Sequence, residues 1–207
     1  MNRGKLIVFE GLDGSGKSTH MRLLAAELTA QGEKVHQTKE PSDSAVGMYI
    51  RKILTESLNK DMNLQAALFL ADRLEHITDP ADGMNRYLND GYTVICDRYY
   101  YSSFAYQGTK TDLDWVMDIN LSAPPMITPD LCIFLDVPPT ECKQRLDNER
   151  ANLELYEKDI QLLEQVRTNF LTVFDKLGSH ENIVMIDANR DKNAVFADVA
   201  KAAAVIL

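Results

Sequence analysis

The sequence is poor in cysteine, has no block of basic residues and contains no long apolar run. Its three cysteines, Cys96, Cys132 and Cys142, are odd in number and scattered, which favours reduced thiols over disulfides or a metal site. The net charge of −9, without a cluster of Lys and Arg, argues against a surface for nucleic acid or anionic membrane. No stretch approaches the ~20 apolar residues that span a bilayer, and the first residues do not resemble a secretory signal. We therefore expect a cytoplasmic protein that binds neither nucleic acid nor a membrane.

Short apolar runs alternate with longer stretches of helical periodicity. The runs predict buried β-strands over residues 5–10, 33–38, 92–97, 130–136 and 182–187. The main helices are predicted over residues 17–31, 64–78, 152–177 and 191–206. This alternation predicts an α/β fold in which helices cover both faces of a parallel sheet. No linker rich in Pro, Gly or Ser divides the 207 residues, so we expect a single domain, 1–207.

One short motif carries most of the functional information. Gly11, Gly16, Lys17 and Ser18 satisfy the pattern G-x-x-x-x-G-K-[ST] between an expected strand and an expected helix, the context of a phosphate-binding loop. Glycines let successive backbone N–H groups point at phosphate oxygens, and the helix adds its positive N-terminal end. Lys17 would reach the transferring phosphates, and Ser18 would ligate Mg²⁺. The residues expected to bind the nucleoside triphosphate are Gly11, Leu12, Asp13, Gly14, Ser15, Gly16, Lys17, Ser18 and Thr19.

A phosphate loop alone leaves three classes open: a GTPase switch, an ATPase motor and a small-molecule kinase. Residues 109–112, TKTD, are similar to the guanine-reading [NT]KxD motif, but they follow the loop AYQG and not an apolar strand. No D-x-x-G switch lies between them and the phosphate loop. A motor would usually need a partner or nucleic-acid surface, to which nothing here points. The kinase class needs an acceptor site.

Two segments supply candidates for that site. Asp97 and Arg98 follow an expected strand at its carboxyl end, where open α/β sheets bind ligands, and an arginine can hold phosphate with two hydrogen bonds. Phe69 and Arg73 are four residues apart, so a ring and a guanidinium share one helical face. Such a pair can clamp a nucleobase, although a core Phe beside a surface Arg has the same spacing.

The segments EGLDGSGKST, KEPSDS, LFLADR, DRYYYSSFAYQG and PDLCIFLDVPP, followed by a charged helix, resemble the thymidylate kinase family in this order. The similarity spans nearly the whole chain. It implies a P-loop fold of the nucleoside monophosphate kinase type with a five-stranded parallel sheet. The implied reaction transfers the γ-phosphoryl group of ATP to dTMP with Mg²⁺, giving dTDP and ADP. The family also implies a homodimer, with helices around residues 44–88 as the interface.

The resemblance further implies roles at the acceptor nucleoside. Phe69 would stack on thymine, and Arg73 would hydrogen-bond its O4 edge. Ser102 and Gln107 would line the base pocket. Tyr106 would fill the space beside C2′ and thereby disfavour a ribose hydroxyl.

Other implied roles concern the phosphates and the donor. Arg98, helped by Arg51, would hold the acceptor phosphate. Asp13, an acid inside the phosphate loop, would accept a hydrogen bond from the deoxyribose 3′-OH. Asp97 would either orient Arg98 or reach Mg²⁺ through water. Arg190, which follows the last strand, would pass beside the adenine of ATP.

The sequence departs from the family pattern at two places. The family often has Arg-Glu-Pro followed by Gly-Gly-Thr, whereas residues 39–44 are KEPSDS, and a lysine is a point charge without the forked geometry of arginine. One branch of the family carries an arginine in the phosphate loop where this chain has Gly14. The catalytic arginine is therefore expected from a lid, residues 142–159, which holds Arg145 and Arg150. Arg150 is favoured because it is closer to the expected lid tip.

Two alternatives stay open at this point. One is a kinase on the same scaffold that acts on another nucleoside monophosphate or on a deoxynucleoside, and the sequence does not separate dTMP from dUMP. The other is a regulatory P-loop switch with a protein partner, which leaves the second phosphate-binding site without a use.

Overall fold

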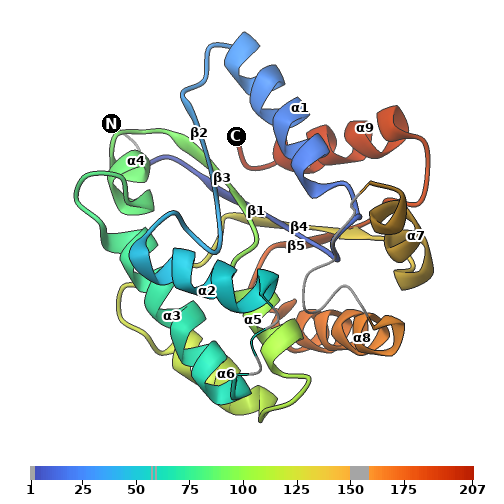
Figure 1. Ribbon diagram of the computed structural model, residues 1–207. Coiled ribbons are helices and arrows are strands. Elements are labelled where there is room, and N and C mark those ends of the chain that lie inside the picture. Colours follow the sequence, from blue (N-terminus) through green and yellow to red (C-terminus); the bar gives the residue numbers. More distant parts are fainter. Residues whose placement is uncertain (1–2, 57, 59, 150–158) are drawn as a thin grey trace.

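The computed structural model describes residues 3–56, 58, 60–149 and 159–207. Its centre is a five-stranded sheet in which neighbouring strands run parallel, in the order β2-β3-β1-β4-β5 (Figure 1). The strands are β1 (Leu6–Glu10), β2 (Val35–Lys39), β3 (Thr93–Asp97), β4 (Leu131–Asp136) and β5 (Ile183–Asp187). The predicted strands and their parallel arrangement are confirmed, and each strand begins one or two residues after the start of its predicted run.

The burial of each strand explains its place in the sheet. All five side chains of β1 are buried, whereas the outer strands β2 and β5 are partly exposed. A strand covered on both faces needs such a continuous apolar run. Val8 in β1 lies opposite Cys96 of β3 and Cys132 of β4. These two cysteines and Cys142 are buried, free thiols, as predicted.

Helices connect the strands and cover both faces of the sheet (Figure 1). In the described residues they are α1 (Lys17–Ala30), α2 (Ala45–Thr55), α3 (Met62–Thr78), α4 (Met84–Asn89), α5 (Tyr100–Gln107), α6 (Leu113–Leu121), α7 (Pro139–Glu149), α8 (Ile160–Leu177) and α9 (Lys192–Ala203). On one face α1 packs against α9, and on the other α5 packs between α3 and α8. Within the described ranges, no helix has the length and apolar character needed to cross a bilayer.

Local capping sets the ends of the first predicted helices. The helix predicted over 17–31 is confirmed as α1, and Gly32 follows it at a φ of 90°, in the left-handed region that favours glycine. The helix predicted over 64–78 begins earlier, at Met62. The reason is Asp61, whose side chain accepts hydrogen bonds from two backbone N–H groups of the first turn.

The later predictions are met in part. The helix predicted over 191–206 is confirmed as α9, but it ends at Ala203. The helix predicted over 152–177 is seen as α8 from Ile160 onward. Residues 150–158, which include Arg150 and much of the predicted lid, lie outside the described residues.

Candidate active site

The phosphate loop leaves β1 and enters α1, as predicted. Gly11, Gly14 and Gly16 have φ values of 144°, 82° and 94°, which favour glycine. The Lys17 side chain folds back over the loop, and its Nζ donates hydrogen bonds to the carbonyls of Gly11 (3.0 Å) and Leu12 (2.9 Å). Burial lowers the pKa of Lys17. The ammonium group is thus held against the backbone of the phosphate loop.

Several buried polar atoms near the loop have no hydrogen-bond partner within the described part of the chain. They are Ser15 Oγ, His20 Nδ1, Asp97 Oδ1 and Gln107 Oε1. An unsatisfied buried polar group costs about 1–3 kcal/mol, so such atoms mark places where a ligand can bind.

A hydroxyl and a carboxylate lie together at the start of α1. Ser18 Oγ donates to Asp97 Oδ2 at 3.1 Å, while Asp97 Oδ1 is one of the unsatisfied atoms. Hydroxyl and carboxylate oxygens are ligands that Mg²⁺ accepts, usually together with substrate phosphates and water. The pair therefore fits a divalent ion bound with a triphosphate. It does not form an all-protein cage, and the described residues contain no group of three or more His, Cys, Asp or Glu that could hold a metal.

Arg98 links the end of β3 to the phosphate loop. Its backbone φ is 69°, which is uncommon for a residue with a side chain, and its N–H donates to the Phe9 carbonyl at 2.9 Å. The guanidinium donates to Asp13 Oδ1 (2.8 Å) and to Ser102 Oγ (2.9 Å), and it lies 5.1 Å from the ring centre of Tyr106. Residues predicted to bind the phosphoryl donor and residues predicted to bind the phosphoryl acceptor therefore meet at this guanidinium.

Glu10, the last residue of β1, forms hydrogen bonds with the start of α5. It is fully buried and accepts hydrogen bonds from the Tyr99 N–H (2.8 Å), the Ser102 N–H (3.1 Å) and Ser102 Oγ (2.6 Å). Burial raises the pKa of Glu10 from 4.5 to about 7, although nearby Arg98 opposes the shift. Sequence reasoning missed this residue. The sequence signal was an acid at the end of an otherwise apolar strand. A buried acid is rare unless it has hydrogen-bond or ionic partners, so Glu10 pointed to such partners.

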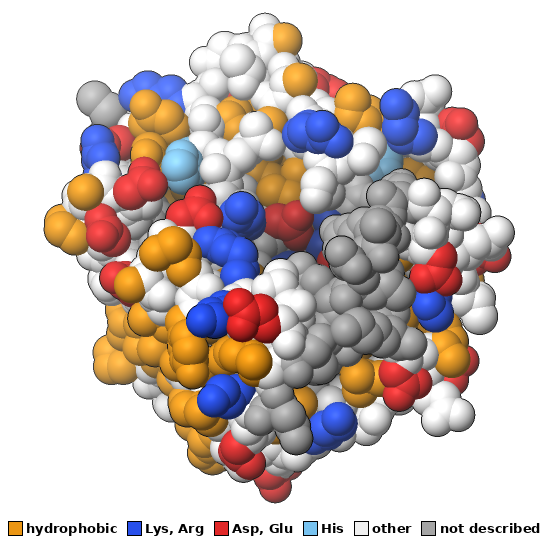
Figure 2. Space-filling model, in the orientation of Figure 1, with side chains coloured by type: hydrophobic (Ala, Val, Ile, Leu, Met, Phe, Trp, Pro, Cys, Tyr) orange, Lys and Arg blue, Asp and Glu red, His pale blue; other side chains and the backbone are white. Residues whose placement is uncertain are grey.

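A cavity of about 210 Å³ opens beside Arg98. Its lining residues are Asp13, Lys39, Glu40, Pro41, Arg51, Leu54, Phe69, Arg98, Ser102, Tyr106 and Gln107. Except for Arg73 and Asp97, every residue predicted for the acceptor site is among them. In the view of Figure 2, basic and acidic side chains gather around a hollow near the middle of the molecule. The cavity combines the cations Lys39, Arg51 and Arg98 with the aromatic rings of Phe69 and Tyr106.

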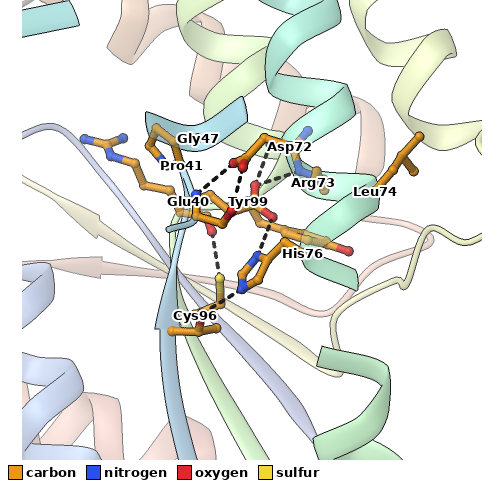
Figure 3. A network of polar contacts seen from close by, with 12 residues as sticks. Glu40, Pro41, Gly47, Asp72, Arg73, Leu74, His76, Cys96 and Tyr99 are labelled. Carbon is orange, nitrogen blue, oxygen red and sulfur yellow. Dashed lines mark hydrogen bonds and ion pairs between the residues drawn. The ribbon is translucent and has the colours of Figure 1, made fainter. Parts of the chain in front are cut away.

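Arg73 lies in a buried polar network behind the cavity, and only 1% of it is exposed. Its Nε donates to Glu40 Oε2 (2.8 Å), its Nη2 to Ser103 Oγ (3.0 Å) and its Nη1 to Asn120 Oδ1. His76 Nδ1 lies 3.3 Å from the other Glu40 oxygen, and Figure 3 shows Glu40 between these α3 side chains. The contact between Arg73 and a base stays a prediction.

The loop after β2 is fixed from two sides. Asp72, fully buried on α3, accepts hydrogen bonds from the Ser42 N–H (2.8 Å), Ser42 Oγ (2.6 Å) and Ser44 Oγ (2.9 Å). Arg51 of α2 donates to the carbonyls of Pro41 and Ser42, each at 2.6 Å. Ser42 thus adds a side-chain bond that glycine at this position would lack. The loop and Arg51 brace each other at the cavity wall.

The first lid arginine touches the phosphate loop. Arg145 of α7 donates to the Gly14 carbonyl (3.1 Å) and to Asn189 Oδ1 (3.2 Å). A Cβ atom on Gly14 would lie 2.7 Å from the Cys142 carbonyl oxygen, and the φ of Gly14 also disfavours a side chain. Close packing of α7 against the loop therefore leaves no room for an arginine at this position. Arg150 lies outside the described residues.

Arg190 lies after β5 and is exposed. Its Nη2 donates to Asp198 Oδ2 at 2.6 Å, and its Nε donates to the Asp187 carbonyl at 2.8 Å. Its place beside adenine stays a prediction.

The TKTD segment is the turn between α5 and α6. Its last residue, Asp112, accepts a hydrogen bond from the Trp115 N–H and caps α6. Because the segment does not follow a strand, its structural context differs from that of the guanine-reading motif.

One explanation accounts for three features of the molecule. These are the order of the parallel strands, the phosphate loop after the central strand, and the second, cation-lined cavity beside Arg98. Such a site could hold two phosphate-bearing ligands side by side, so that one phosphoryl group can pass between them. The molecule is a P-loop phosphotransferase of the nucleoside monophosphate kinase type.

Comparison with known proteins identifies the family. A family model described as thymidylate kinase matches residues 9–199. A probable thymidylate kinase of Pyrococcus horikoshii is 43% identical over 178 residues, which cover 82% of each chain. One of Staphylothermus marinus is 39% identical over 201 residues, or 97% of this chain and 94% of the relative. A thymidylate kinase of Desulfotalea psychrophila is 38% identical over 170 residues, or 82% of this chain and 81% of the relative.

The chain therefore belongs to the thymidylate kinase family. It is a phosphotransferase that phosphorylates dTMP to dTDP with ATP. Kinases of this family work with a divalent metal ion.

Proposed function

We propose that the γ-phosphoryl group of ATP is transferred in line to the phosphate of dTMP, and that Arg98 lies at the junction between the two phosphates. The supporting observation is that this guanidinium is bonded to Asp13 of the phosphate loop and also lines the acceptor cavity. The transition state spreads negative charge over the oxygens of the transferring group. A cation fixed at the junction can hold the acceptor phosphate, together with Arg51, and stabilise that charge.

On the donor side, residues 11–19 hold the phosphates of ATP, and Lys17 exchanges its two carbonyl partners for phosphate oxygens. The metal that we propose is Mg²⁺, with Ser18 as its ligand and Asp97 acting through water. The fit of these two oxygen donors supports this choice. Bound Mg²⁺ would neutralise charge on the β- and γ-phosphates. Arg190 is proposed to pass beside the adenine.

On the acceptor side, Phe69 stacks on thymine, and Tyr106 fills the space beside C2′. Gln107 is 1% exposed, and its unsatisfied Oε1 suits the N3–H group of thymine, which is a donor. Ser102 lines the pocket beside it. We assign the O4 edge to Arg73, whose Nη1 carries a second N–H group besides the one given to Asn120. Asp13 is assigned to the deoxyribose 3′-OH.

The organisation of the chain completes the proposal. Residues 1–207 form one domain, and residues 142–159 form a lid over the donor site. Arg150 brings the catalytic positive charge, since Gly14 has no space for a side chain. Arg145 instead holds the lid base to the phosphate loop.

We further propose a homodimer formed through α2, α3 and α6. Large apolar side chains are exposed on these helices: Met48, Tyr49, Leu64, Trp115 and Leu121. Exposed apolar side chains concentrated on neighbouring helices are typical of a subunit interface. Sedimentation of the wild type and of Leu64→Glu tests this, and a wild-type monomer would contradict the dimer.

An ADP-release assay tests the acceptor assignment. Turnover should be highest with dTMP among dTMP, dUMP, dCMP, dGMP and thymidine. Preference for another acceptor would overturn the base-pocket roles. Slow hydrolysis that no acceptor stimulates would instead favour a regulatory switch.

Arg98→Ala tests the junction itself. Removing a charged hydrogen-bonding partner costs about 2 kcal/mol or more, so kcat/KM for dTMP should fall at least about 30-fold. Arg3→Ala is the matched control, because Arg3 pairs with Asp130 at the opposite end of the sheet. Equal activities of the two variants would remove Arg98 from the reaction.

A further inference from the structure

Asp43 is the middle residue of Ser42-Asp43-Ser44, where the family often has Gly-Gly-Thr, and it lies beside the cations that line the acceptor cavity. Its Oδ1 lies 2.5 Å from Arg51 Nη2 and 3.8 Å from Lys39 Nζ. Both cations line the 210 Å³ cavity, whereas Asp43 lines a neighbouring cavity of about 580 Å³. The acid therefore approaches Arg51 and Lys39 from outside the acceptor cavity.

The residues on either side of Asp43 are anchored, although its own side chain is 83% exposed. Ser42 and Ser44 both bond to the buried carboxylate of Asp72 (Figure 3 shows Asp72 beside this loop). A Cβ atom on Gly47 would lie 2.1 Å from the Ser42 carbonyl oxygen, so α2 packs tightly against the loop. The backbone of Asp43 is thus held beside Arg51, which limits where its side chain can go.

Other contacts also hold Arg51 in place, independently of Asp43. Two backbone carbonyls, those of Pro41 and Ser42, accept hydrogen bonds from its two terminal nitrogens. Loss of the Asp43 charge would leave this guanidinium in place but without its acidic partner. An acceptor phosphate that binds Arg51 must share or displace the same carboxylate.

We propose that Asp43 is an internal counter-anion that competes with the acceptor phosphate for Arg51 and Lys39 and so weakens nucleoside monophosphate binding. This inference rests on the proposed role of Arg51 at the acceptor phosphate. The two negative groups repel each other, and either one can neutralise the cations. Because Asp43 is exposed, solvent screens the effect, and we expect it to change affinity about two- to fivefold.

The test compares Asp43→Asn with Asp114→Asn. Asp114 is a similarly exposed acid, and it pairs with Lys176 on α8. Isothermal titration should show dTMP binding about two- to fivefold tighter in Asp43→Asn and unchanged in Asp114→Asn. The KM for dTMP should fall in parallel, while the KM for ATP stays constant. Asp43→Ser, which also removes the charge, should behave like Asp43→Asn.

Two further readouts separate competition for phosphate from a general change in the loop. Thymidine lacks the phosphate, so its binding should be the same in wild type and Asp43→Asn. The gain for dTMP should shrink as salt is raised, because ions screen exposed charges. Unchanged or weaker dTMP binding in both Asp43 variants overturns the proposal, as does an equal gain for thymidine.

Arg51→Met distinguishes failure of this inference from failure of the proposed site. If Arg51→Met leaves dTMP affinity unchanged, then Arg51 does not bind the acceptor phosphate and the site assignment is wrong. If Arg51→Met weakens dTMP binding but Asp43→Asn does not strengthen it, only the role of Asp43 is wrong.

Discussion

The acceptor side of the active site is largely completed by the fold, whereas the donor side is not. Behind the acceptor cavity, Arg73 and Glu40 form an ion pair that is almost fully buried, and Asp72 accepts three hydrogen bonds from the loop after β2. On the donor side, Ser15 Oγ and Asp97 Oδ1 have no partners among the described residues, whereas the lining of the acceptor cavity leaves one such atom, Gln107 Oε1. Folding therefore shapes most of the acceptor pocket, and under the proposed function a triphosphate with its metal would supply the missing partners of the donor site.

This difference has an energetic consequence. Breaking a satisfied buried network leaves an uncompensated charge in the free protein, which is costly. Unsatisfied polar atoms on the donor side of the active site instead favour the ligand-bound state, because a ligand that binds only the folded protein stabilises it. Acceptor-side substitutions should therefore lower the stability of the free protein, and donor-side substitutions should lower the stabilisation by ATP.

The largest effect is expected for Arg73→Met. It leaves the Glu40 carboxylate buried without its cation, and we expect the free energy of unfolding to fall by about 3–5 kcal/mol. Urea unfolding of the free protein measures this. The double variant Arg73→Met/Glu40→Met should recover much of the loss, because no buried charge then lacks a partner.

Asp97→Asn is the donor-side counterpart. It should change the stability of the free protein by less than about 1 kcal/mol, because an amide keeps the hydrogen bond to Ser18. It should, however, reduce the rise in melting temperature caused by Mg²⁺ and ATP. Equal losses of stability in Arg73→Met and Asp97→Asn would end the distinction between the two sides.

A further prediction concerns Glu10, which lies between the two sides. Its pKa is about 7 when folded, against 4.5 for an ordinary glutamate, so the folded state binds the proton more tightly. The stability that this proton confers is complete below pH 4.5 and is lost as the pH rises to about 7. The shift corresponds to roughly 3 kcal/mol.

Residue 10 cannot titrate in Glu10→Gln. The free energy of unfolding of this variant should therefore rise by about 3 kcal/mol relative to that of the wild type as the pH increases from 4.5 to 8. Urea unfolding over this range measures the difference. Glu27→Gln, at a partly exposed glutamate on α1, is the control and should show a constant difference. A constant difference between Glu10→Gln and the wild type over this range would mean that folding does not raise the pKa of Glu10.

The sequence predicted the parts of this molecule that depend on local patterns. Strands follow from apolar runs, and the phosphate loop follows from glycine spacing. Glu10 was missed because its partners come from α5, distant in the chain. The helical face shared by Phe69 and Arg73 was predictable. The burial of Arg73 was not, because Asn120 and Ser103, which bind it, come from two other helices.

The last prediction separates the two lid arginines. Arg150→Ala should lower kcat at least tenfold, about 1.4 kcal/mol, with little change in ATP binding, because it would act on the charge of the transition state. Arg145→Ala should mainly raise the KM for ATP, since Arg145 bonds to Gly14 and Asn189. Steady-state kinetics with ATP and dTMP varied separately resolve the two. Near wild-type kcat in both variants would contradict the lid assignment, and the charge that Gly14 cannot carry would then have to come from elsewhere in the site.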